Sequence, residues 1–155
     1  MKIPFVDLKL QYQSIKSEID KAVQNVLDDT AFIGGKYVAQ FEKEYAAYLG
    51  VKHCIGVGNG TDALTLALKA LGIKEGDEVI VPANTFIGTS EAVTLAGGRV
   101  AFADCDPDTQ TITPETVERA LTARTRAIIP VHLYGNPAPV SELKELADSR
   151  GLFLV

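Results

Sequence analysis

Apolar residues recur at helical spacing through the first fifty residues of the chain. Within residues 11–29 they are three or four positions apart, which places them along one side of an amphipathic helix. This apolar stripe consists of Ile15, Ile19, Val23 and either Val26 or Leu27. After a break at Gly34-Gly35 the spacing returns, and Gly50 is a typical helix terminator. We therefore expect an N-terminal helical segment over residues 1–50.

From residue 51 onward, short apolar runs alternate with helical patterns. The strand-like runs are residues 54–58, 78–82, 99–104, 127–135 and 152–155, and the helical patterns are residues 61–71, 86–96, 114–121 and 141–149. Such alternation is typical of βαβ units, whose right-handed crossovers give mostly parallel strands with helices on both faces of the sheet. We predict an α/β fold over residues 51–155. Because the last strand pattern stops at Val155 with nothing after it, we expect the chain to be truncated there.

Composition and charge narrow the class of ligand. The chain has 155 residues, 46% of them apolar and 23% charged, as in ordinary globular proteins. Its formal charge of −5 comes from scattered acids without a basic run, which argues against a nucleic-acid partner. No apolar run approaches the roughly 18 residues of a membrane helix, and no leader pattern is present. We expect a cytoplasmic protein that binds small molecules, with Cys54 and Cys105 as buried free thiols and no metal site.

The transition from the first strand pattern to the next helix is rich in glycine. Gly58 and Gly60 allow a ligand to approach the backbone closely, and Thr61 adds a hydroxyl beside the free amides of a first helical turn. Such a helix start favours an anion such as a phosphate. A dinucleotide fingerprint starting at Gly56 fails, because Thr61 stands where its last glycine is required. The alternative is that Thr61 only caps the helix.

A second strand ends at Val81-Pro82, and its loop leads to Phe86. Carboxyl ends of parallel strands open on one edge of a sheet, so we expect Phe86 and Thr61 to face one pocket. An aromatic ring there can stack on a flat heteroaromatic ligand. The pair therefore favours a flat, phosphorylated ligand. The alternative for Phe86 is a core aromatic at the start of a helix.

The remaining polar candidates are interpreted as structural or solvated. His132 is expected to be a hydrogen-bonded structural residue, and Lys144 to lie on the polar side of an amphipathic helix. Glu91 could approach a substrate only if its helix faced the pocket. Asp104 and Asp106 are expected to bond local backbone in a turn, and not to form a carboxylate pair or a metal site.

Several longer motifs occur together in a characteristic order. They are IPFVDLKLQY, GNGTDAL, GDEVIVPANTF, AVTLAGGRVAFADCDPDT and IIPVHLYGNPAPVSEL. In this order and spacing the chain resembles, over essentially its whole length, the N-terminal portion of the DegT/DnrJ/EryC1/StrS aminotransferases. The resemblance implies the aspartate-aminotransferase fold (fold type I), with residues 51–155 as the first part of the large domain. It also implies a pyridoxal 5′-phosphate cofactor, whose phosphate would be held by Gly60, Thr61 and Asp62 and whose ring would stack on Phe86.

The implied activity is transfer of an amino group from glutamate to a nucleotide-linked keto-sugar. The family's aspartate partner of the pyridine nitrogen and its Schiff-base lysine would both follow Val155, so we expect no catalytic residue in the chain and no activity for it alone. A dehydratase of the same fold, with histidine in place of the lysine, and a non-catalytic fragment remain alternatives. The family also implies a homodimer, in which the first two helices and Gly34-Gly35 are expected to take part.

Overall fold

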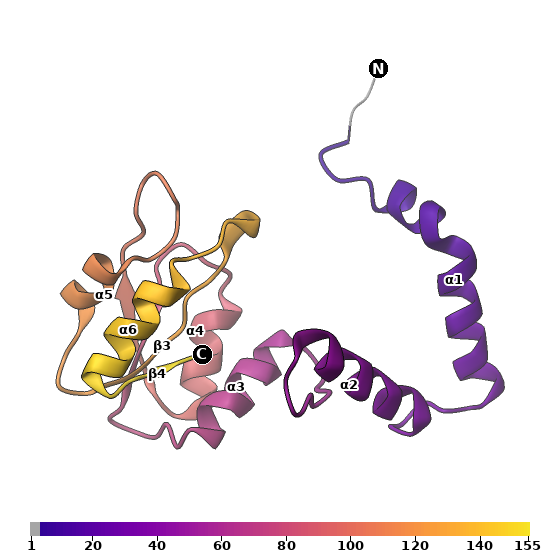
Figure 1. Cartoon of the computed structure of the whole chain (residues 1–155), viewed down its shortest axis with the longest axis horizontal. Coiled ribbons are helices and arrows are strands. Elements are labelled where there is room, and N and C mark those ends of the chain that lie inside the picture. Colours follow the sequence, from indigo (N-terminus) through magenta and orange to yellow (C-terminus); the bar gives the residue numbers. More distant parts are fainter. Residues whose placement is uncertain (1–3) are drawn as a thin grey trace. The chain divides into compact units, whose positions relative to one another are not determined.

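The structure, a computed structural model, describes residues 4–155, and the chain divides into two compact units between Gly56 and Val57 (Figure 1). The first three residues of the predicted N-terminal segment lie outside the described residues. None of the helices in residues 4–155 is both long and apolar enough to cross a membrane.

The first unit contains the two predicted helices, α1 (Leu8–Asp28) and α2 (Lys36–Leu49). At the start of α1, the carboxylate of Asp7 accepts a hydrogen bond from the amide of Leu10 at 2.9 Å. Gly50 ends α2 in the left-handed conformation, with φ of 67°, as its position in the sequence predicts. α1 buries none of its side chains, and Ile15 and Ile19 of the predicted stripe are each 41% exposed.

The second unit contains a parallel sheet, as predicted. Its strands in the described chain are β1 (Glu78–Pro82), β2 (Arg99–Ala103), β3 (Thr125–Ile128) and β4 (Phe153–Leu154), in the spatial order β2-β1-β3-β4. In the centre of the sheet Ile80 pairs with Ala101 on one side and with Ile128 on the other. All three pairings are parallel.

Helices cover both faces of this sheet, which confirms the predicted α/β layers. They are α3 (Gly60–Ala70), α4 (Gly88–Ala96), α5 (Pro114–Ala120) and α6 (Val140–Arg150). From β1 the chain crosses to one side to form β2, and then crosses back past β1 to form β3 and β4. Because right-handed crossovers in opposite directions use opposite faces, α4 lies on one face and α5 and α6 on the other.

Two apolar cores fill the space between the helices and the sheet. On one face Leu68 of α3 and Val93 of α4 pack against Val79 and Val81 of β1. On the other face the side chain of Ile80 joins a cluster with α5 and α6 that includes Val117, Ile128, Leu143 and Ala147. Successive residues of β1 thus serve opposite cores, and Val79, Ile80 and Val81 are all fully buried.

A buried carboxylate joins the amino ends of β1 and β3. Glu78 accepts hydrogen bonds from the Thr122 hydroxyl at 2.5 Å and from Nε of Arg124 at 2.8 Å. Nη2 of Arg124 lies 2.6 Å from the same carboxylate oxygen, and only 8% of the Glu78 side chain is exposed. The Thr122 hydroxyl, and then the guanidinium of Arg124, lower the pKa of Glu78.

Two strand predictions need correction. Residues 54–58 do not form a strand: no described strand lies beside them to complete a hydrogen-bond ladder, and Ile55 is 78% exposed. The run predicted over residues 127–135 forms a strand only up to Ile128, because Pro130 has no amide for the ladder and the chain turns into a 3-10 helix at Leu133–Gly135. The expectation of buried thiols was also wrong, since Cys54 and Cys105 are free but partly exposed.

The Glu78 contacts predict how stability depends on pH. A glutamate whose pKa is lowered in the fold stabilises it above its ordinary pKa, and this contribution is lost as pH falls through the lowered value. The thermal midpoint of the chain should therefore fall on acidification below about pH 4.3. Glu78→Gln should lower the thermal midpoint at pH 7 and make the midpoint depend less on pH in the acid range. Glu75→Gln, at an exposed position nearby, should change neither the midpoint nor its pH dependence. Thermal melts followed by circular dichroism from pH 7 to 3 test this. An equal decrease of the thermal midpoint with falling pH in the wild type and Glu78→Gln would contradict it.

Candidate functional site

The first turn of α3 has free hydrogen-bond donors. Asn59 is the N-cap, and its side-chain oxygen accepts from the amide of Asp62 at 2.9 Å. The amides of Gly60 and Thr61 have no acceptor among residues 4–155. Two unpaired amides at the positive end of a helix favour an anion. Because Asn59 caps the helix, the alternative reading of Thr61 as the cap is wrong.

Thr61 and Phe86 line one hollow, as their positions in the sequence predict. Its volume is about 440 Å³, and its lining residues are Asn59, Gly60, Thr61, Leu64, Phe86, Gly88 and Thr89. The hydroxyl of Thr61 has no hydrogen-bond partner within residues 4–155. Phe86 is 74% exposed, so within the described chain it is not the core aromatic of the alternative. A free hydroxyl and an open aromatic face therefore border the same space.

Gly88 is a functional candidate that sequence reasoning missed. A Cβ atom at this position would lie 2.7 Å from Oγ1 of Thr61 and 2.8 Å from a ring carbon of Phe86. The missing side chain thus allows the first turns of α3 and α4 to approach each other with both groups beside the hollow. The available signal was a glycine in the first turn of a helix, where it is a poor helix former.

Asp62 lies beside the hollow and is not among its lining residues. Its carboxylate accepts a hydrogen bond from Nδ2 of Asn59 at 2.9 Å. A negative charge in the first turn of a helix is favourable, and here it also fixes the capping side chain. The structure therefore brings Gly60, Thr61 and Phe86 together at one surface and places Asp62 behind them, against the cap.

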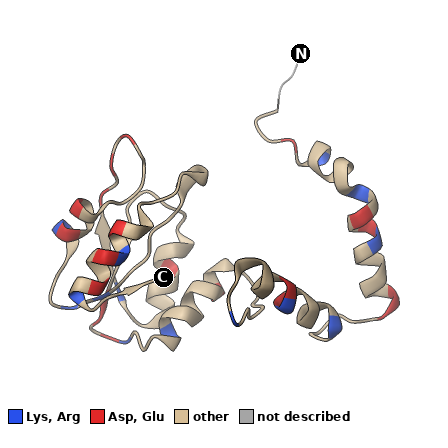
Figure 2. Cartoon of the chain, in the orientation of Figure 1, with Lys and Arg blue, Asp and Glu red and all other residues tan. Residues whose placement is uncertain are grey.

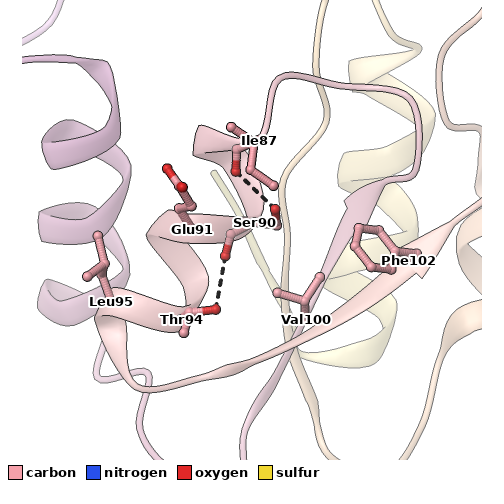
Figure 3. A pocket seen from close by; sticks show the side chains of 7 residues that line it. All are labelled: Ile87, Ser90, Glu91, Thr94, Leu95, Val100 and Phe102. Carbon is pink, nitrogen blue, oxygen red and sulfur yellow. Dashed lines mark hydrogen bonds between the residues drawn. The ribbon is translucent and has the colours of Figure 1, made fainter.

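Glu91 lies in a different hollow, between α4 and β2 (Figure 3). This hollow has a volume of about 630 Å³ and is lined by Ile87, Ser90, Glu91, Thr94, Leu95, Val100 and Phe102. The hydroxyls of Ser90 and Thr94 donate to the carbonyl groups of Ile87 and Ser90, at 2.9 and 3.3 Å. Glu91 thus does not border the space between Thr61 and Phe86.

The other polar candidates have the structural roles expected of them. Nδ1 of His132 accepts a hydrogen bond from the amide of Ala138 at 3.0 Å. Lys144 is exposed and forms an ion pair with Asp148 on α6, where acidic and basic residues are interspersed (Figure 2). Asp106 accepts from two backbone amides of its turn, and the bond from the amide of Thr109 is the main cause that lowers its pKa. Asp104 likewise bonds the neighbouring amide, of Cys105.

Comparisons with known proteins identify the family of this arrangement. The family model of the DegT/DnrJ/EryC1/StrS aminotransferase family matches residues 13–155. A dTDP-3-amino-3,4,6-trideoxy-alpha-D-glucose transaminase of Streptomyces venezuelae is 46% identical over 154 residues, which are 99% of this chain and 41% of that protein. A crystal structure of DesV from S. venezuelae with a ketimine intermediate matches with a TM-score of 0.93 and 46% identity, over 99% of this chain and 41% of that one.

A third relative has a different activity. The structure of GDP-4-keto-6-deoxy-D-mannose-3-dehydratase from E. coli, with bound hydrated PLP, matches with a TM-score of 0.78 and 37% identity, over 86% of this chain and 36% of that one. The chain spans about two fifths of the length of the curated relatives that it matches. Its parallel sheet with helices on both faces is the predicted aminotransferase fold. On the match over residues 13–155, the chain belongs to the DegT/DnrJ/EryC1/StrS aminotransferase family.

Proposed function

We propose that the complete protein is a pyridoxal-phosphate-dependent aminotransferase that moves an amino group from glutamate to a nucleotide-linked keto-sugar. The observation that carries this proposal is the hollow in which the free amides of Gly60 and Thr61 meet the exposed ring of Phe86. A phosphate at one end and a flat ring at the other match these two surfaces. The family of the chain, and the sugar transaminases among its relatives, support the same assignment.

The residues present fit the cofactor. The amides of Gly60 and Thr61 and the Thr61 hydroxyl supply donors for phosphate oxygens, and charge-assisted bonds of this kind are the stronger ones. Phe86 offers a ring face for stacking, and Gly88 leaves the intervening space open. The volume of about 440 Å³ is within the range of small-molecule sites.

The chemistry divides between the cofactor and the protein. When bound, pyridoxal phosphate supplies the electron sink that amino-group transfer requires. The described lining of the hollow contains no titratable side chain, so these residues bind and orient and do not move protons. Proton transfer belongs, in this proposal, to residues of the complete protein outside this chain.

A dehydratase acting on a similar sugar is the second candidate, because one matching structure has that activity. Both activities would use the same phosphate and ring contacts, so the hollow does not distinguish them. In the complete protein, a lysine at the Schiff-base position would indicate the transaminase and a histidine the dehydratase.

We also propose a homodimer, supported by the exposed apolar stripe of α1.

Loss of the Thr61 hydroxyl should weaken cofactor binding. Thr61→Ala in the complete protein removes a bond to a charged phosphate, worth about 1.5 to 3 kcal/mol, or roughly ten- to hundredfold in Kd. Thr61→Ser keeps the hydroxyl and should remain within about threefold of the wild type. Fluorescence titration of the apoprotein with pyridoxal phosphate measures the affinities. Equal values for the alanine and serine variants would remove Thr61 from the site.

Filling the space at Gly88 should also weaken binding. Gly88→Val places a branched side chain against the Thr61 hydroxyl and the Phe86 ring, so that one or both must move. A Thr61 hydroxyl that has moved can no longer donate to the phosphate, so cofactor binding should weaken by about 1.5 to 3 kcal/mol, as in Thr61→Ala. Thr94→Val introduces the same side chain on the same helix outside the hollow and serves as the control. The prediction is wrong if both variants bind the cofactor equally at similar thermal stability.

The 155-residue chain alone should not transaminate. With pyridoxal phosphate and glutamate it should form no 2-oxoglutarate above the rate of free cofactor, because no titratable group lines the hollow. Borohydride treatment should label surface lysines weakly and without selection. Coupled assay of 2-oxoglutarate and mass-spectrometric mapping of the lysines test this. Turnover with stoichiometric labelling of one lysine would place the catalytic machinery inside the chain.

A further inference from the structure

Tyr134 has an unusual backbone conformation for an aromatic residue. Its φ of 56° and ψ of 20° place it in the left-handed region, which bulky side chains rarely adopt. Tyr134 is 88% exposed, so the contacts of a buried side chain do not offset the energetic cost of this conformation within the described chain. Strained residues of this kind are found where a ligand or partner requires a side chain in one position.

The turn that carries Tyr134 is fixed on both sides. Before it, Nδ1 of His132 accepts from the amide of Ala138 at 3.0 Å, which closes the turn. After it, the side-chain amide of Asn136 donates to the carbonyl of Thr109 at 2.7 Å, in the loop that follows β2. These two hydrogen bonds hold the strained backbone in place. The exposed ring therefore projects from a turn that is fixed on both sides.

The position of the turn points to the ligand edge of the sheet. β1 and β3 are neighbours, and their chains leave toward opposite faces, to α4 and to α6. Ligands of open parallel sheets bind at such a point, beyond the carboxyl ends of the strands. Phe86 follows β1 and Tyr134 follows β3. Two aromatic residues, 74% and 88% exposed, thus follow adjacent strands at the same edge of the sheet.

We propose that Tyr134 stacks on the base of the nucleotide-linked substrate and thereby sets affinity for the amino acceptor. This inference rests on the proposed function. Phe86 already provides the face for the cofactor ring, and glutamate has no flat ring to stack. The base is the remaining planar group, and bases stack on aromatic side chains whatever their sequence. Tyr134 is therefore a substrate-binding residue whose effect is confined to the acceptor.

The two half-reactions of the complete protein separate this role from the others. Tyr134→Ala should leave the conversion of glutamate to 2-oxoglutarate, with bound cofactor in single turnover, within about twofold. Binding of thymidine, uridine or guanosine 5′-diphosphate, whichever binds the wild type most tightly, should weaken by roughly five- to hundredfold by calorimetry. Tyr134→Phe keeps the ring and should bind like the wild type.

Tyr134→Gly adds a readout that is independent of activity. Glycine adopts positive φ freely, so this variant should lose nucleotide affinity while its thermal midpoint stays equal or rises. A lower midpoint with unchanged nucleotide affinity would mean that Tyr134 packs against the rest of the complete protein, and would overturn the inference. So would equal affinities of the wild type and Tyr134→Ala, or no binding of these nucleotides by the wild type. Absence of the glutamate half-reaction in the wild type would instead count against the proposed function.

Discussion

The complete burial of β1 is the constraint on which the rest of the second unit depends. Val79, Ile80 and Val81 have no exposed surface, because strands flank β1 on both sides and helices cover both faces. The chain that follows this buried strand reaches the surface beyond the carboxyl end of β1. From there it leads into the first turn of α4. Packing of α3 and α4 on the same face then brings Thr61 beside Phe86. The position of the hollow therefore follows from the packing of α3 and α4 on the core.

Charge is distributed unequally between the two edges of the sheet. At the amino edge the carboxylate of Glu78 pairs with Arg124 and accepts a hydrogen bond from Thr122. These contacts join β1 to the start of β3. At the carboxyl edge the amides of Gly60 and Thr61 are left without acceptors in the described chain. The buried carboxylate at one edge is thus paired within the chain, whereas two amides at the other edge have no acceptor in the described residues. Unpaired donors are costly to leave without a partner, so the carboxyl edge is the one suited to bind a ligand in the proposed function.

The elements could be predicted from the sequence wherever their pattern was set by local burial. β1, β2 and the helices after residue 60 were predicted correctly because the spacing of their apolar residues matches the residues that pack in the two cores. Residues 54–58 have the same apolar character but no neighbouring strand, and pairing is not encoded in the spacing of one segment. The hollow was found from Thr61 and Phe86, whose chemistry is visible in their side chains. Gly88 was missed because its contribution is the absence of atoms, which only the three-dimensional approach of α3 and α4 reveals.

The described lining of the hollow has no titratable side chain, and this determines how its contacts with a ligand depend on pH. Its contacts come from backbone amides, one hydroxyl and one ring, and none of them changes charge over the pH range in which proteins are folded. The contribution of these contacts to binding a phosphorylated ligand should therefore follow the ionisation of the ligand. On the proposed function, groups that move protons would lie outside this lining, so changes in them would leave these particular contacts unaltered. Relatives with transaminase and dehydratase activities on the same fold are consistent with this separation.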